Sequence, residues 1–377
     1  MHILLVPSEY PTSDHKLGGI FTKEQENYLS NHHKIGVIYI YLFSIKKLLS
    51  NLFYKILTYK IENRLSIYYF PRLPYLKYLN YVIHYFFFKK LFKKYIRKNG
   101  TPDLIHVHFS EFAVWTAYKI KQKYNIPYVV TEHSTDFLDG TYEKNYPKSS
   151  KIYNKVCLSL KNAKKIICVS SILKKKIQNF YKIKESKLTI IPNLSFEINL
   201  RKIKKLYDII FVGSFDERKN PMLLLEAFKL VYANKLKMIM IGEGPLKSKI
   251  DNFIEINELK KNVKVFPALS KRRVLNYINK SKILALPSNF ETFGIVVIEA
   301  YSLGVPVVMT DSQGVRDLFN YKSCVLVNKK DANNFATGIK NILNNYKNFK
   351  SKEIVKYYKK NFSPKIVIKK INSLYSL

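Results

Sequence analysis

The sequence predicts an α/β fold with two doubly wound domains, each built on a mostly parallel sheet. Short apolar runs alternate with segments of helical pattern along the whole chain. The chain has 377 residues, which is too long for one hydrophobic core, and its 47% hydrophobic content is enough to fill two. Polar and glycine-rich residues follow directly after the apolar runs, where open parallel sheets bind ligands.

The apolar runs place the strands in two series. The first series comprises residues 3–6, 34–41, 65–70, 104–107, 128–132, 165–169 and 188–191. The second comprises residues 208–212, 238–241, 263–266, 283–286, 307–310 and 325–327. A charged segment at 200–206 separates them, so we expect domains at 1–198 and 207–360. Two rims of polar residues that face each other would form a cleft between these domains.

Cysteine content and the amino terminus indicate a cytosolic protein. Cys157, Cys168 and Cys324 form no CxxC pair, so reduced structural cysteines are expected. The apolar start of the chain ends at Pro7, too early for a signal peptide. No apolar run has the length needed to span a bilayer.

The net charge of +38 has two open interpretations. An AT-rich codon pool would raise lysine content without any binding partner, whereas a local excess indicates one. Residues 63–102 contain no acid, and the segment 81–98 is predicted to be a basic, aromatic, amphipathic helix. This helix either meets an anionic membrane surface or packs with a solvated lysine face. Nucleic acid is not an expected partner, because no RNP strand, zinc spacing or helix-turn-helix pattern is present.

The most informative motif is a pair of acids, Glu291 and Glu299, on either side of a Phe-Gly turn. A helix that starts near Ile295 would direct N–H groups at a ligand above the preceding strand, as phosphate sites do. Glu299 lies about 7.5 Å along this helix from Gly294, which is the distance from a diphosphate to its ribose. Glu291 would then face the other end of the ligand. The alternatives are a buried helix acid and an ordinary loop acid.

Three further loops contain candidate phosphate ligands. Gly18 and Gly19 allow close approach of backbone N–H groups, although such pairs also form simple turns. Lys219 precedes a predicted helix at 222–231, where a cation could meet a diphosphate. We favour it over its neighbour Arg218, because adjacent residues on such a turn rarely point the same way, and a solvated Lys-Arg pair is the alternative. The segment Gly242-Glu243-Gly244 lacks the third glycine of a dinucleotide fingerprint, which argues against a nicotinamide dehydrogenase.

Histidines provide the remaining candidates. His133 follows the strand at 128–132, where open sheets place reacting groups, although a structural histidine is the alternative. His106 and His108 share one face of a strand, but no third metal ligand is evident. No two aspartates stand two residues apart, so the chain has no DxD motif for metal-bound diphosphate. A cation or a helix dipole must therefore neutralise the diphosphate.

Together these motifs resemble the retaining glycosyltransferases of family 4, which have the GT-B architecture of two facing Rossmann-like domains with an interdomain cleft. The resemblance covers nearly the whole chain, and the spacing of Glu291 and Glu299 matches the family's E-x7-E motif. Thr131 to Ser134 resembles the active-site histidine motif, and 191–193 resembles the segment before the interdomain crossing. Residues 361–377 resemble the family's final helix, which packs back on the first domain.

The resemblance implies specific roles. Lys219 would neutralise the donor diphosphate with help from Gly19 and the amides near Phe293. Glu299 would bind the ribose. The catalytic pair would be His133, which contacts the sugar, and Glu291, which contacts the sugar or its phosphate. The implied donor-binding set is Gly18, Gly19, Ser214, Arg218, Lys219, Gly242, Glu243, Gly244, Phe293, Gly294, Ile295 and Glu299. Front-face attack assisted by the leaving diphosphate needs no protein nucleophile and no divalent metal or other cofactor.

Two positions depart from the family pattern. Many members have an arginine where this chain has Ser214, and a glycine where it has Leu194. The expected activity is transfer from a UDP- or GDP-linked sugar to a lipid-linked or surface-polysaccharide acceptor, as in lipopolysaccharide or capsule synthesis. The expected location is the cytoplasm, peripheral at the inner face of an anionic membrane. The alternatives are a UDP-sugar epimerase of the same architecture and a non-catalytic basic protein that binds polyanions or membranes.

Overall fold

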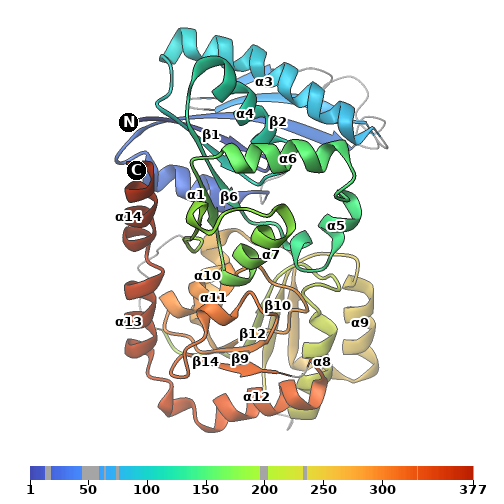
Figure 1. Ribbon diagram of the computed structural model, residues 1–377. Coiled ribbons are helices and arrows are strands. Elements are labelled where there is room, and N and C mark those ends of the chain that lie inside the picture. The colour runs from blue at the N-terminus through green and yellow to red at the C-terminus, as the bar shows by residue number, and fades with distance from the viewer. Residues whose placement is uncertain are drawn as a thin grey trace. The chain divides into compact units, whose positions relative to one another are not determined.

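The computed structural model of the protein describes residues 1–12, 18–44, 59–62, 65–73, 76–195, 203–231, 236–328 and 330–376. The chain divides into two compact units (Figure 1). The first contains Met1–Pro192 together with Ile368–Leu377, and the second contains Asn193–Val367. Part of the charged segment at 200–206 lies outside the described residues, so the expected domain limits stay predictions.

The first unit contains an eight-stranded sheet with the order β3-β4-β2-β1-β5-β6-β7-β8. All pairs are parallel except β3 with β4, which is antiparallel. The strands are β1 (His2–Pro7), β2 (Lys34–Ser44), β3 (Tyr59–Glu62), β4 (Leu65–Arg72), β5 (Leu104–His108), β6 (Tyr128–Glu132), β7 (Lys165–Cys168) and β8 (Leu188–Ile190). All seven strands expected in this half are present, and the edge strand β3 was not expected.

The helices of the first unit connect these parallel strands. α3 contacts β2 and β4, α4 contacts β5 and β6, and α6 packs on α4, so these three helices form one layer. The helices are α1 (Ile20–Leu29), α3 (Lys77–Asn99), α4 (Ala113–Tyr124), α5 (Thr141–Asn145), α6 (Lys151–Asn162) and α7 (Ser171–Tyr181). The last helix, α14 (Pro364–Tyr375), ends in this unit, where the Tyr375 hydroxyl lies 2.6 Å from His106 Nδ1.

The second unit contains a six-stranded, fully parallel sheet with the order β11-β10-β9-β12-β13-β14. Its strands are β9 (Tyr207–Val212), β10 (Met238–Ile241), β11 (Val263–Phe266), β12 (Ser281–Leu286), β13 (Val307–Thr310) and β14 (Cys324–Val327). Its helices are α8 (Pro221–Val231), α9 (Lys247–Ile256), α10 (Lys271–Asn279), α11 (Ile295–Ser302), α12 (Ala332–Asn344) and α13 (Ser351–Asn361). All six strands expected in this half are present.

Helices cover both faces of the second sheet because successive side chains of each strand point to opposite faces. Ile209 and Phe211 of β9 belong to a fully buried core with α8, α9 and α12. α10 contacts β9 and β12, and α11 contacts β12, on the other face. The carboxyl ends of β9, β10, β12 and β13 lie at one edge of this sheet, and the loops that follow them carry most of the predicted site.

Two expectations from composition can be compared with the fold. Cys157, Cys168 and Cys324 are buried and free. In the described ranges, no helix is long and apolar enough to cross a membrane.

Candidate functional site

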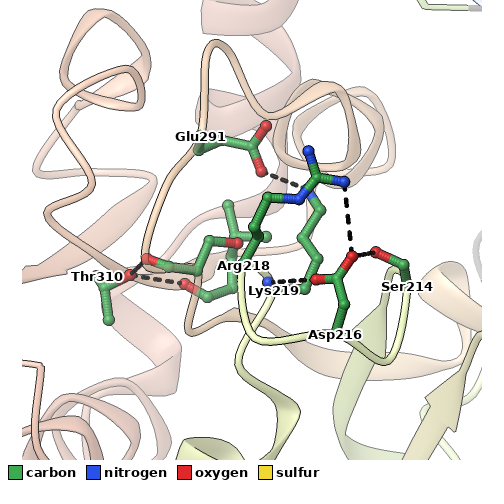
Figure 2. A network of polar contacts seen from close by, with 8 residues as sticks. Ser214, Asp216, Arg218, Lys219, Glu291 and Thr310 are labelled. Atoms are coloured by element: carbon green, nitrogen blue, oxygen red, sulfur yellow. Dashed lines mark hydrogen bonds and ion pairs between the residues drawn. The ribbon is translucent and has the colours of Figure 1, made fainter. Parts of the chain in front are cut away.

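The loop between β9 and α8 is organised around the carboxylate of Asp216 (Figure 2). This carboxylate accepts hydrogen bonds from the Ser214 hydroxyl at 2.7 Å and from the Lys219 amide at 2.9 Å. The guanidinium of Arg218 lies 3.6 Å from the same group. Burial opposes ionisation, but these hydrogen bonds and the nearby cations outweigh it and keep the pKa of Asp216 below its usual value. The loop is therefore fixed before any ligand binds.

Lys219 reaches the first acid of the E-x7-E pair. Its Nζ lies 2.5 Å from Glu291 Oε2, as Figure 2 shows. The Glu291 side chain is 9% exposed and that of Lys219 is 26% exposed. An ammonium group has three donors, so Lys219 can keep this contact and still bind an anion from the solvent side.

The backbone of Glu291 is held by the loop that follows β13. Glu291 and Gln313 form an isolated parallel bridge. Gly314 packs so closely that an added Cβ would lie 1.8 Å from the Glu291 carbonyl oxygen. Beneath them, the Thr310 hydroxyl donates to the Ser288 carbonyl at 2.5 Å. These contacts fix the position of Glu291 relative to the sheet edge.

The second acid, Glu299, lies on α11, which begins at the residue expected from the sequence. Gly294 is the N-cap residue in a left-handed conformation with φ 86°, and no side chain caps the helix. Phe293 is buried, and Ile295 is the first helical residue. Glu299 is buried and forms an ion pair with Lys271. Each acid of the motif is thus paired with its own lysine.

The segment Gly242-Glu243-Gly244 supports the β9–α8 loop from the neighbouring strand. An added Cβ on Gly242 would lie 1.9 Å from the Gly213 carbonyl oxygen, so only glycine fits there. The Glu243 carbonyl accepts from the Phe215 amide at 2.8 Å, and its carboxylate accepts from the Ala268 amide at 3.1 Å. The structure gives this segment a role in packing.

Three predicted site residues belong to the first unit. Gly18 precedes α1, and Gly19 is its N-cap residue with φ 60°. An added Cβ on Gly19 would lie 2.2 Å from the Glu9 carbonyl oxygen, so the fold itself requires glycine there. His133 is buried directly after β6, and its ring centroid lies 4.4 Å from that of Phe21 on α1. The structure therefore places His133 next to the glycine loop.

Several functional candidates were missed from the sequence. Lys271 is the first residue of α10, and nothing in its local pattern indicates a contact with a helix 28 positions later. Asp216 lies in the loop before the predicted helix at 222–231, but the sequence does not indicate that its carboxylate accepts hydrogen bonds from Ser214 and Lys219. Glu132 is a buried acid that accepts hydrogen bonds from the amides of Ser110, His133 and Ser134 at 2.8–2.9 Å.

Burial raises the pKa of Glu132, although the hydrogen bonds that it accepts counteract the effect. Within the part of the chain that the structure describes, no group of three or more His, Cys, Asp or Glu side chains could hold a metal ion.

Comparison with known proteins identifies the family. Residues 194–362 match the sequence profile "Glycosyl transferases group 1", and residues 54–194 match the profile "Glycosyltransferase Family 4". The two matches are adjacent and divide near the border between the two units. The chain belongs to the family 4 glycosyltransferases.

Relatives of this glycosyltransferase support the assignment. An uncharacterized glycosyltransferase of Methanocaldococcus jannaschii is 27% identical over 82% of this chain and 86% of its own length. The putative teichuronic acid biosynthesis glycosyltransferase TuaC of Bacillus subtilis is 29% identical over 63% of this chain, and the match spans only 60% of TuaC. The Anabaena protein HepE, solved in complex with UDP, has a TM-score of 0.73 at 16% identity, with 100% of each chain covered. The glycosyltransferase therefore has the GT-B fold.

Proposed function

We propose that this glycosyltransferase transfers a sugar from a nucleoside diphosphate sugar, with retention at the anomeric carbon, to a lipid-linked or surface-polysaccharide acceptor. In this proposal it works in cell-envelope glycan synthesis and needs no divalent metal. The observation that carries the proposal is the pairing of Lys219 with Glu291 beside the N-terminus of α11, because it places a cation and helix amides around one anion site. The family membership favours transfer over the epimerase and polyanion-binding alternatives.

The donor diphosphate would bind where the β9–α8 loop meets the start of α11. Lys219 supplies a fixed positive charge, and the first amides of α11 supply dipoles directed at the leaving group. Both are in place before reaction, so they stabilise the charge that develops on the leaving diphosphate without reorganisation. Ser214 stands where many members have an arginine, and Arg218 is directed to Asp216, so most of this stabilisation rests on Lys219.

The ribose would bind at Glu299, whose carboxylate can accept hydrogen bonds from both ribose hydroxyls. Lys271 now holds this carboxylate, so it would stay beside the ribose or move aside when the donor binds. Glu291 would contact the transferred sugar or its phosphate, and His133 would contact the sugar near the anomeric carbon. Retention then follows from front-face attack, in which an oxygen of the leaving diphosphate takes the proton of the attacking acceptor hydroxyl.

The membrane part of the proposal rests on the outer face of α3. Residues of this helix at helical spacing form a continuous exposed stripe that is apolar in its first half and basic in its second: Leu79, Val82, Phe86, Lys90, Lys93 and Arg97. The Phe86 side chain is 63% exposed. Such a stripe can insert apolar groups at the level of lipid headgroups while its cations meet anionic lipids. A lipid-linked acceptor would then be presented at the same surface.

Donor binding is tested by thermal shift with UDP, GDP and their sugar conjugates. A ligand at 100 times its Kd stabilises the protein by about 2.7 kcal/mol, which is readily measured. Transfer is then measured with the stabilising donor and membrane lipid extracts as acceptor, in EDTA and in magnesium, and the anomeric configuration of the product is read by NMR. Transfer that needs the metal, or an inverted product, would contradict the proposed mechanism.

Membrane association is tested by flotation with vesicles of neutral lipid or of 30% anionic lipid. We expect binding to the anionic vesicles and its loss when Lys90, Lys93 and Arg97 are all changed to Glu. A charge-matched control changes the exposed Lys249, Lys261 and Lys264 of the second unit to Glu and should keep the binding. Equal loss in both variants would mean that overall charge, not the α3 stripe, drives association.

A further inference from the structure

A buried carboxyl group in the first unit accepts hydrogen bonds from two separate loops. Glu132 is the last residue of β6 and is 1% exposed. Its Oε2 accepts from the amide of Ser110 at 2.9 Å and from the hydroxyl of the same residue. Its Oε1 accepts from the amides of His133 and Ser134, both at 2.8 Å. Because Ser110 follows β5 and the other two residues follow β6, the Glu132 side chain joins the two loops.

These hydrogen bonds continue the pairing of β5 and β6 beyond the ends of the strands. The backbone ladder between the strands reaches the Phe109 amide, which donates to the Thr131 carbonyl at 2.8 Å. The next amide, that of Ser110, donates to the Glu132 side chain instead. A backbone N–H can only donate. The three amide bonds to Glu132 therefore keep their direction whether its carboxyl group is ionised or neutral.

The residue before Ser110 has a strained backbone. Phe109 has φ 66°, a costly conformation for a bulky residue, which persists only where the surrounding structure enforces it. In this conformation the Phe109 ring lies with its centroid 5.0 Å from that of His133. The strained residue is held on both sides, by its own bond in the ladder and by the bonds of Ser110 to Glu132.

We propose that Glu132 is a positioning residue that fixes the place of the His133 ring. It acts in two ways, because it binds the His133 amide and also holds the loop from which the Phe109 ring contacts the His133 ring. Phe21 on α1 contacts the same ring, with centroids 4.4 Å apart. If the bonds to Glu132 are lost, the backbone at His133 shifts and its ring moves relative to both neighbours.

The consequence for catalysis rests on the proposed function, in which His133 contacts the transferred sugar near the anomeric carbon. Misplacement of a group at the reacting centre by about 1 Å can lower the rate roughly 100-fold. The diphosphate and the ribose would bind to Lys219, Glu299 and the amides of α11, all of which belong to the second unit. Loss of the Glu132 bonds should therefore lower kcat and leave KM for the donor nearly unchanged.

The variant Glu132→Gln tests these bonds because it keeps the size of the side chain and replaces one oxygen by an NH2 group. An NH2 group in place of Oε2 faces the Ser110 amide, and an NH2 group in place of Oε1 faces the amides of His133 and Ser134. Two donors meet in either orientation of the glutamine, so at least one amide loses its acceptor.

The matched control is Glu111→Gln, which removes an acid from the residue next to Ser110. Glu111 accepts a hydrogen bond from the Tyr146 hydroxyl. The amide oxygen of glutamine can accept the same bond, so this variant changes the acid content of the loop without placing two donors against each other.

The bonds are tested directly by hydrogen exchange of single amides, measured by NMR on the full chain without substrate. In the unaltered chain we expect the amides of Ser110, His133 and Ser134 to exchange as slowly as those of the β5–β6 ladder, although all three are in loops. Glu132→Gln should speed exchange roughly 10-fold or more at one or more of these amides and leave the ladder protected, and Glu111→Gln should change neither. Rapid exchange of the three amides in the unaltered chain would overturn the proposal even if the variant does not fold.

Ring signals and kinetics separate a positioning role from a purely structural one. Glu132→Gln should shift the ring proton signals of His133, which depend on the neighbouring aromatic rings, and should lower kcat roughly 10- to 100-fold at a nearly unchanged donor KM. Unaltered His133 ring signals in this variant, or an equal loss of kcat in Glu111→Gln, would contradict the proposal. Hydrogen exchange and ring signals need no donor, so a failure of the unaltered chain to transfer sugar would refute the proposed function alone.

Discussion

The ion pair between Lys219 and Glu291 allows a quantitative test of the proposed donor site. The change is Lys219→Met, which keeps the length of the side chain and removes its charge. It leaves the Glu291 carboxylate, 9% exposed, without the cation that lies 2.5 Å away. Removing one partner of a fully buried pair costs roughly 3–5 kcal/mol, and since Lys219 itself is 26% exposed, we expect about 2–3 kcal/mol here.

A double-mutant cycle separates this pair from its surroundings. Glu291→Gln leaves only a partly solvated cation and should cost about 1 kcal/mol, and the double variant should cost no more than Lys219→Met alone. The coupling free energy, the sum of the two single costs minus the double cost, is then at least about 1 kcal/mol. The only tryptophan, Trp115, belongs to the first unit, so its fluorescence would not report this change. Hydrogen exchange of α8 amides in the second unit is the appropriate measurement.

Donor affinity distinguishes a ligand-binding lysine from a purely structural one. A cation about 4 Å from a phosphate contributes up to about 4 kcal/mol near a protein surface, so Lys219→Met should weaken UDP or GDP binding roughly 100-fold. Glu291→Gln should not weaken it, because it removes a negative charge near the diphosphate. The double variant should be as weak as Lys219→Met despite its recovered stability. Unchanged nucleotide affinity in Lys219→Met, measured by calorimetry, would refute the reasoning.

Three further predictions concern the surrounding structure. Lys271→Met should lower the stability of the second unit by about 2 kcal/mol and leave pyrophosphate affinity unchanged, as hydrogen exchange and calorimetry would reveal. Gly242→Ala should destabilise by about 1–3 kcal/mol in urea unfolding because its Cβ would meet the Gly213 carbonyl, whereas Gly213→Ala, with its nearest contact at 3.4 Å, should be tolerated. Burial lowers the pKa of His84 to about 3. Below pH 6.5 this histidine therefore binds a proton in the unfolded chain but stays neutral in the folded chain, so the free energy of unfolding falls as the pH falls. When the pH is lowered from 7.5 to 5.5, the His84→Leu variant should lose about 1 kcal/mol less of its free energy of unfolding than the unaltered chain. Unfolding is followed by Trp115 fluorescence.

The parallel strands were predictable because they are buried on both faces and therefore appear as continuous apolar runs. β13 is an example, with all four of its residues buried. The edge strand β3 was missed for the opposite reason. Its sequence, Tyr-Lys-Ile-Glu, is short and charged, and only its antiparallel pairing with β4 identifies it as a strand.

The start of α11 was predictable because Gly294 and the apolar residues after it are local signals. The pairing of Glu299 with Lys271 was not, since it depends on how α10 and α11 pack against the same strand. The hydrogen bond of His108 to His133 is of the same kind. Two strands adjacent in the sheet bring these residues together, and the sequence identifies each histidine without the register that joins them.

The charges around the proposed donor site explain why position matters more than net charge. Lys219, Lys271 and Arg218 are each paired with an acid, namely Glu291, Glu299 and Asp216, so these six groups sum to zero. In the proposed site, a diphosphate therefore gains nothing from the net charge of this group and would bind through the position of Lys219 and the amides of α11. The overall charge of +38 acts over longer distances, where salt screens it, and under the proposed function it would affect how often an anionic donor and anionic lipids meet the protein. A high net charge and a neutral set of paired residues are thus compatible, because under the proposed function the net charge would govern encounter and the paired residues would govern where the diphosphate binds.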